Sequence, residues 1–378
     1  MKRKLVNWAG TMYMSPDLLR QLEDYFFELQ SECTALGLNN FRYGLLPLNE
    51  ETSAEHGIVI QEKITGSIEM RLFRCRAITQ GGYLIDYPPE TTDCLVRNFT
   101  FTEETVNNDQ TWDVILSISP YNRTLSGIPA EDEDPPRHPD AVPTVDFSIL
   151  PANQINEDKL NPQQLVIGKI KKRGERYEID TNYIPPCICM TAHPQLMRYY
   201  NQLVTMMGSL ENASRDIVRK IKDKEKNSSL AGNIEKLCQE IMRHISTVYF
   251  SFRNIGANWS PYETVNYFSS LAHVFYVGLS FLSVQEREEL FNYFYEWQIV
   301  VPGKFEASLS QLIEMRYNHN DIYTMIGTVM EFMTALTDLW IKLGELEYIG
   351  LHKRSVIVSE GLIEEESKAN KLLKRLFS

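Results

Sequence analysis

The sequence contains no long hydrophobic run, few cysteines and no excess of positive charge. A helix that spans a bilayer needs about 20 consecutive apolar residues, and no stretch of this chain approaches that length. The basic start Met1–Leu5 is not followed by the apolar core of a signal peptide. Six cysteines among 378 residues do not form the dense framework of a secreted disulfide-rich domain. These features predict a cytoplasmic protein that does not insert directly into a membrane.

The chain also lacks the motifs of common enzymatic chemistry. Its net charge of -12 disfavours nucleic-acid binding, which requires a clustered basic surface. Gly303-Lys304 is not part of a phosphate-binding loop, because Gln298 stands where that loop needs its first glycine. No zinc-protease, EF-hand or nucleophile-elbow motif occurs. We therefore expect no catalytic site, no cofactor, no metal and no nucleic-acid partner.

Three features are potential metal or proton sites, but each has a simpler interpretation. Cys187, Cys189 and His193 lie close in sequence, yet zinc usually takes four ligands in recognisable pairs and no second pair is near. Buried thiols at a strand–helix junction fit these cysteines better. His244 lies in an apolar row, where a local hydrogen bond is more common than a metal ligand or a pH switch. The acidic residues 131–134 could bind calcium, but a solvated loop is the simpler expectation.

Hydrophobic periodicity changes at Ile184-Pro185-Pro186. Before this point short apolar runs alternate with period two, which is typical of strands; after it they recur every three or four residues, which is typical of helices. The alternation predicts nine strands in an antiparallel sandwich or barrel. They are Arg42–Leu48, Ile58–Lys63, Glu69–Ala77, Tyr83–Tyr87, Leu95–Phe101, Asp113–Ser119, Val145–Ile149, Leu165–Lys171 and Arg176–Ile179.

Other elements of the first half are less regular. We expect a short strand at Lys4–Trp8, then a helix capped by Ser15 that runs to about Ala35. Ile128–Pro143 is rich in proline and acidic residues and predicts a mobile surface loop. Trp8 and Met12 precede the helix. A tryptophan at this place contributes most to stability or to binding if it fills a pocket, either in its own domain or on a partner.

The second half predicts a bundle of long helices. Two of them, joined by the polar turn Lys222–Ser229, form an antiparallel hairpin of roughly 40 Å. Its apolar seams would pack within a bundle or between chains. The candidate oligomer core is Val329, Phe332, Leu336 and Leu339. Aromatic residues are too numerous for one core face, so we expect some at a subunit interface.

The predicted fold class is α+β, an antiparallel β-sandwich followed by a long helical-hairpin bundle. The predicted domains are residues 1–190, 191–348 and a tail at 349–378. In the tail, Leu362, Leu372 and Leu376 form an apolar stripe flanked by lysine and arginine. This stripe either folds back on its own bundle or docks in a partner's groove.

Four stretches together resemble a known family. They are residues 6–16 (VNWAGTMYMSP), 43–48 (YGLLPL), 81–88 (GGYLIDYP) and 183–192 (YIPPCICMTA). Their order and spacing are similar to those of the TssK family, baseplate subunits of bacterial type VI secretion systems. The chain departs from the family pattern at residues 17–19, where DLL replaces the usual Gln-His-Phe, and at Gly81, where the family has Asp.

The resemblance implies a homotrimeric, non-enzymatic adaptor. In that family a β-rich shoulder docks on the wedge proteins TssF and TssG, a helical neck forms the trimer body, and a C-terminal head contacts the cytoplasmic part of the membrane complex. Here only 32 residues follow Leu346, which is too few for that head and predicts a compact variant. The resemblance then implies that the protein is located in the cytoplasm, within the baseplate at the inner face of the bacterial inner membrane. The competing interpretation is a phage-like tail or receptor-binding baseplate protein, which shares the shoulder fold.

Overall fold

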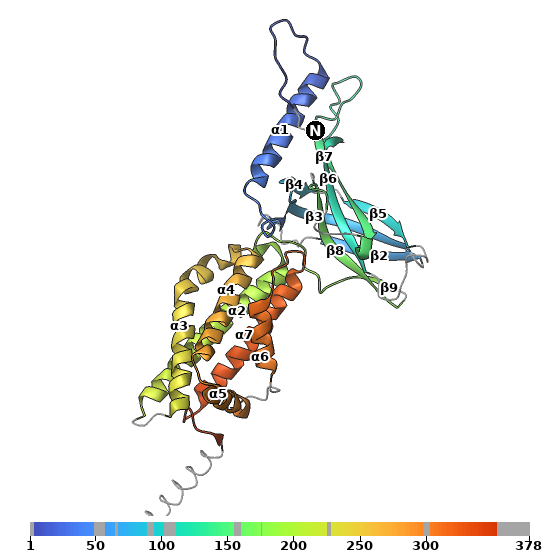
Figure 1. Ribbon diagram of the computed structural model, residues 1–378. Helices are drawn as coiled ribbons and strands as arrows, with labels where there is room; N and C mark the ends of the chain where they lie inside the picture. Colours follow the sequence, from blue (N-terminus) through green and yellow to red (C-terminus); the bar gives the residue numbers. More distant parts are fainter. Residues whose placement is uncertain are drawn as a thin grey trace, which may run out of the picture. The chain divides into compact units, whose positions relative to one another are not determined.

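The computed structural model describes residues 4–48, 57–64, 67–88, 94–101, 111–154, 160–174, 176–224, 228–297 and 303–353. The chain divides into two compact units. The β unit contains residues 1–197 together with 258–262 and 317–324; the helical unit contains residues 198–257, 263–316 and 325–378. The α+β class is confirmed, with antiparallel sheets first and helices after them (Figure 1).

The β unit is built from two antiparallel sheets. All nine predicted strands are present. The first sheet holds β1 (Gly44–Leu45), β2 (Gly57–Ile64), β3 (Ser67–Ile78), β4 (Leu84–Tyr87) and β5 (Leu95–Thr100). The second holds β6 (Thr111–Ser126), β7 (Asp140–Pro151), β8 (Gln164–Arg173) and β9 (Arg176–Ile179) in the order β7-β6-β8-β9. β3 is central to the first sheet, because it pairs with all four of its neighbours.

The two sheets pack face to face as a sandwich (Figure 1). Gly168 of β8 lies so close to the other sheet that a Cβ there would be 3.6 Å from Cδ1 of Ile58. At the opposite edge the rings of Phe99 and Phe147 are 5.9 Å apart, and Arg97 pairs with Asp146 at 2.9 Å. Apolar burial between the sheets is the main stabilising term of this unit.

The short strand β1 connects distant parts of the β unit. The amide of Leu45 donates to the Pro186 carbonyl at 2.7 Å, and the amide of Ile188 donates to the Leu45 carbonyl at 3.0 Å. Gly44 has a φ of 112°, and a Cβ there would lie 2.0 Å from the Pro186 oxygen. Only glycine permits this approach, so the Pro-Pro junction is held directly against the first sheet.

Two expectations for the β unit are wrong in part. Lys4–Trp8 forms no strand; the Lys4 carbonyl instead accepts a hydrogen bond from the Gln21 side chain at 3.4 Å, so the segment has a helix as its neighbour and not a strand edge. The loop predicted at Ile128–Pro143 is shorter, since β7 begins at Asp140 and its first residues pair with the end of β6. The helix α1 (Pro16–Ala35) is confirmed, and Ser15 caps it.

In the described part of the helical unit the chain forms six α-helices, which are drawn in Figure 1. They are α2 (Pro194–Lys222), α3 (Ser229–Ile255), α4 (Pro261–Ser280), α5 (Val284–Trp297), α6 (Lys304–Glu314) and α7 (Ile322–Glu345). α2 and α3 form the predicted hairpin. Lys220 of α2 donates to the carbonyls of Gly344 and Leu346, so a cation from one helix caps the C-terminal end of α7.

The core of the helical unit is an aromatic cluster around Trp340. The ring of Trp340 lies 5.6 Å from that of Phe275 and 5.8 Å from that of Phe294. Phe332 contacts Phe305 at a centroid distance of 6.0 Å. Most aromatic residues of α4 and α5 are therefore used inside the unit, although Tyr276 is exposed.

A charge placed in this core should unfold the helical unit. Phe332 is fully buried, so we expect Phe332→Asp to lower the free energy of unfolding by about 4 kcal/mol or more, because the carboxylate has no partner there. Urea denaturation followed by circular dichroism measures the loss. Ile341→Asp is the matched control on the same helix, where the side chain is exposed. Equal losses for both variants would contradict the assignment of Phe332 to the core.

Candidate partner-binding surfaces

The residues considered as zinc ligands have separate local partners. The Cys187 thiol donates to the Pro185 carbonyl at 3.1 Å, and the Cys189 sulfur lies 3.1 Å from the Thr191 hydroxyl. His193 accepts from the amide of Gln195 at 3.3 Å. Burial raises the pKa of Cys187 well above its usual value, so the thiol stays protonated and is a poor metal ligand. Within the described ranges, no three His, Cys, Asp or Glu side chains are grouped as a metal site would require.

The other two candidate sites also have structural explanations. His244 lies 3.4 Å from the Tyr267 carbonyl through Nε2 and stacks on the Tyr267 ring, which is the local hydrogen bond expected for it. Partial burial lowers the pKa of this histidine. In the acidic loop, Glu133 forms a bidentate pair with Arg137 across exposed positions. A surface pair of this kind orders the loop only weakly.

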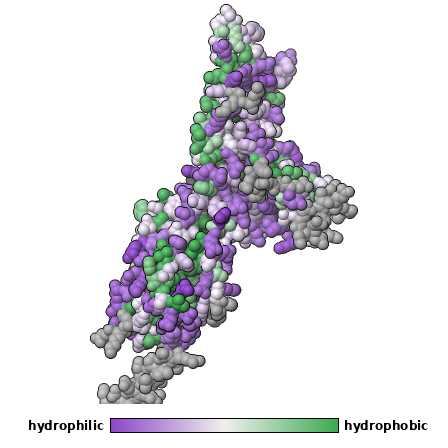
Figure 2. All heavy atoms as spheres, in the orientation of Figure 1, coloured by the Kyte–Doolittle hydropathy of each residue, from purple (hydrophilic) through white to green (hydrophobic). Residues whose placement is uncertain are grey.

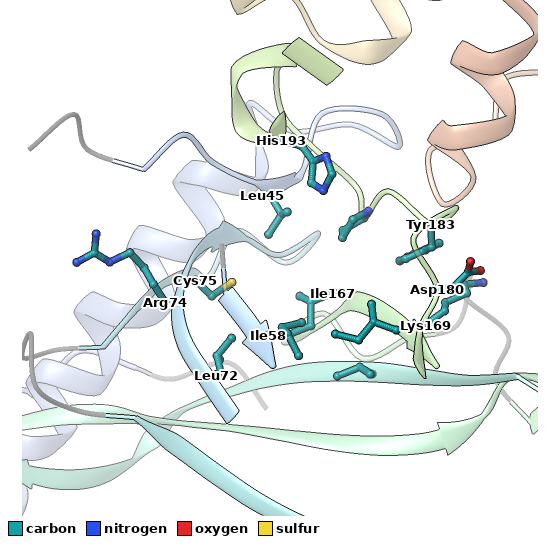
Figure 3. A pocket seen from close by; sticks show the side chains of 14 residues that line it. Leu45, Ile58, Leu72, Arg74, Cys75, Ile167, Lys169, Asp180, Tyr183 and His193 are labelled. Carbon is teal, nitrogen blue, oxygen red and sulfur yellow. The ribbon is translucent and has the colours of Figure 1, made fainter. Parts of the chain in front are cut away.

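A cavity of about 150 Å³ lies between the two sheets (Figure 3). Its walls are mainly apolar, with Leu45, Ile58, Leu72 and Ile167 among them. Cys75 also lines it, and burial raises the pKa of this thiol to about 12. The thiol is therefore protonated at neutral pH and is not a nucleophile. We interpret the cavity as a packing feature of the sandwich.

A buried histidine that sequence reasoning missed lies in the segment between α6 and α7. His319 is almost fully buried in the β unit. Its Nε2 lies 3.0 Å from the Tyr43 carbonyl and its Nδ1 lies 2.9 Å from the Tyr317 hydroxyl. A carbonyl can only accept, so Nε2 carries the proton and Nδ1 accepts from Tyr317. The neutral ring thereby connects residues 317–320 to Tyr43, which directly precedes β1.

The N-terminal segment exposes the residues predicted to bind partners. Trp8 is 48% exposed and Met12 is 36% exposed, and Tyr13 and Met14 are more exposed still. Val6 alone in this region is a buried apolar residue. Trp8 therefore does not fill a pocket in its own domain, and the other possibility, a pocket on a partner, stays a prediction.

The helix α1 also presents apolar side chains to solvent. Leu19, Phe26, Leu29 and Leu36 are all exposed, and Figure 2 shows hydrophobic residues at the surface over this helix. Its opposite face contacts the sandwich, where Arg123 of β6 pairs with Asp24 and also reaches Glu23, which lies beside the apolar row. The sequence signal for this face was present as a spacing of three and four residues, but spacing does not say which side of a helix is covered.

The other predicted positions differ in how far the structure describes them. Leu362, Leu372 and Leu376 lie outside the described residues. Val329, Phe332, Leu336 and Leu339 are buried by their own chain. They therefore need no second copy to cover them, and their contribution to an oligomer stays a prediction.

Solved structures share this architecture. No family model matches the sequence, and no curated protein shows significant sequence similarity to it. A crystal structure of TssK superposes with a TM-score of 0.52 over 88% of this chain and 69% of that chain, at 15% identity. The chain has the fold of TssK. A chain of the TssK-TssF-TssG baseplate subcomplex of the type VI secretion system gives a TM-score of 0.51 over 89% of this chain and 99% of that one, at 11% identity.

A chain of the baseplate complex from the type VI secretion system is similar at a TM-score of 0.50, with 15% identity over 75% of this chain and 91% of the other. A match that covers 88% of this chain includes most of both the β unit and the helical unit. The TssK likeness therefore extends to the order of the two units along the chain. No helix in the described part of the chain has the length and apolar character needed to cross a membrane.

The buried His319 makes the stability of the β unit depend on pH. Burial lowers its pKa to about 4 from a usual value of 6.5. Between these values the unfolded chain binds a proton that the folded chain does not, so the folded state loses about 3 kcal/mol as the pH falls from 7 to 4. The substitution His319→Gln removes this pH-dependent contribution to the free energy of unfolding. The variant should be less stable than the natural protein at pH 7, and the difference should shrink at pH 4.

Urea denaturation at both pH values, followed by tryptophan fluorescence, measures these differences. The control is His273→Gln, at an exposed position of the helical unit, for which we expect a small difference at both pH values. If the deficit of His319→Gln were the same at pH 7 and pH 4, the histidine would not be held neutral by the fold.

Proposed function

We propose that this protein is a non-enzymatic structural adaptor of a type VI secretion baseplate, located in the cytoplasm at the inner face of the inner membrane. In this role it links wedge proteins of the TssF/TssG type to the cytoplasmic part of a membrane complex. The observation that carries the proposal is the similarity to TssK over both units of the chain. The fold alone does not establish a function, so the local surfaces must also suit an adaptor.

The surfaces of the β unit suit a docking protein. Trp8 and Met12 are large apolar side chains exposed next to a helix. Tryptophan is enriched among the residues that contribute most to protein interfaces, because it buries a large area against a partner. We infer that the N-terminal segment binds the wedge proteins. The tight cores of both units then act as rigid supports for such contacts.

We further propose that the protein acts as a homotrimer. A TssK-like adaptor presents several identical shoulders to its partners, so each contact gains from the others through a raised effective concentration. Light scattering of the purified protein tests this directly, since one chain has a mass of 43.8 kDa and a lone species of that mass at micromolar concentration would overturn the trimer.

The wedge contact can be tested with single substitutions. Trp8→Ala should leave the unfolding midpoint nearly unchanged, because the side chain is half exposed, but it should weaken binding to co-expressed TssF/TssG-type proteins about tenfold or more. Co-purification and calorimetric titration measure the effect. Ile128→Ala is the control, since Ile128 is 86% exposed in the same unit but lies in a different loop.

A Trp8→Ala protein that bound the wedge proteins normally would show that the segment is not the docking surface. Failure of the natural protein to bind any wedge protein would argue against the baseplate role itself. In that case a phage-like tail protein, whose gene would stand beside tail genes and not beside secretion genes, becomes the better interpretation.

The tail gives a separate test of the membrane-side contact. We propose that residues 359–378 bind the membrane complex through their apolar and basic stripe. Deletion of these residues should spare trimer formation and wedge binding but abolish recruitment to the membrane complex, as seen by fluorescence microscopy of a labelled protein. Normal recruitment of the truncated protein, or loss of its fold, would contradict this proposal.

A further inference from the structure

The helix α1 carries an apolar row that its own chain does not cover. We call Leu19, Leu22, Phe26, Leu29, Cys33 and Leu36 the α1 seam. Successive members are separated by three or four residues in strict alternation, which places them in one line along a helix with a 3.5-residue repeat. Phe26 is 56% exposed and Leu36 is 89% exposed, and Cys33 is exposed as well.

The orientation of α1 is the reverse of an ordinary amphipathic helix. The face opposite the α1 seam is mainly polar and contacts the sandwich, where Asp24 pairs with Arg123 at 2.9 Å, the Arg123 guanidinium lies 5.9 Å from the centre of the Phe27 ring, and Ser31 is the only buried residue of the helix. Gly82 holds this face close, since its φ is 79° and a Cβ there would lie 2.2 Å from the Ser31 carbonyl. The helix therefore cannot roll to bury its apolar face without losing these contacts.

We propose that the α1 seam is the surface through which copies of this chain meet, with the helices parallel and in register. The inference rests on the homotrimer of the proposed function and names where its subunits touch. A continuous 3.5-residue repeat over five turns fits a partner helix with the same repeat, and an identical copy supplies one. An exposed apolar row of this length on a folded protein marks an interaction site.

The residues beside the α1 seam agree with self-association. In a parallel pair, each residue on one flank lies opposite the residue five positions later in the other helix. The facing pairs are Leu18 with Glu23, Tyr25 with Gln30, and Glu32 with Gly37. None of these pairs opposes like charges. Glu23 is also neutralised by Arg123 of its own chain, so the flanks do not require a basic partner.

The comparison with α7 supports the same location. Its row Val329, Phe332, Leu336 and Leu339 has the same spacing but is completely covered within one chain. Of the two rows, only the α1 seam leaves its apolar area open to a second copy. The contacts between copies are thereby assigned to the β unit.

Cys33 provides a test that needs no substitution. In a parallel, in-register assembly the Cys33 side chains of neighbouring copies face each other across the α1 seam. Mild oxidation of the purified full-length protein with copper phenanthroline should produce a cross-linked dimer on a non-reducing gel. Cys33→Ser should abolish that band and Cys94→Ser should not. No Cys33-dependent band in a protein that is trimeric by light scattering would overturn the proposed seam.

Substitutions in the α1 seam give the second test. Phe26→Glu combined with Leu29→Glu should convert the trimer to a monomer at micromolar concentration, while the circular dichroism spectrum stays that of a folded protein, because both side chains are exposed in one chain. Ile128→Glu is the matched control in the same unit and should remain trimeric. A double variant that stays trimeric contradicts the seam but leaves the homotrimer intact, whereas a monomeric natural protein contradicts both.

Discussion

The β unit depends on residues 43–45, which comprise Tyr43 and the short strand β1. Their backbone bonds to Pro186 and Ile188 on one side and accepts from His319 on another, so three parts of the chain that are far apart in sequence converge there. Gly44 makes the convergence possible, because any side chain would collide with the Pro186 carbonyl.

This junction also explains why particular stretches of the sequence resemble TssK. Residues 43–48 and 183–192 are separated by more than a hundred positions, yet Leu45 and Cys187 form a bridge between them. The Gly81-Gly82 turn likewise lies under Ser31 of α1. Three of the four stretches that carry the resemblance, residues 43–48, 81–88 and 183–192, are therefore contact points with strict steric demands. Elsewhere many apolar residues satisfy the same packing, which is consistent with a shared fold at 11% to 15% identity.

Two apolar rows in this protein, one on α1 and one on α7, have the same spacing but differ in solvent exposure. The row on α7 is buried, with Phe305 of α6 against Phe332, whereas the α1 seam is largely exposed to solvent. The difference arises from what lies on the other side of each helix. α7 has helices around it, while α1 is attached to the sandwich through its polar face.

The sequence by itself determined the class of each half of the chain. Alternation in β3 and β6 and the three–four spacing of the helices are local patterns, so nine strands, α1 and the helical bundle could be predicted from them. The prediction of a strand at Lys4–Trp8 was wrong because a strand must also pair with a free edge of a sheet. Whether such an edge lies nearby depends on residues that are distant in the sequence. Only the tertiary structure decided that residues 317–324 join the β unit and which faces of α1 and α7 are covered. Those outcomes depend on which surfaces remain after the sheets and helices have packed, and spacing along one element carries no information about its neighbours.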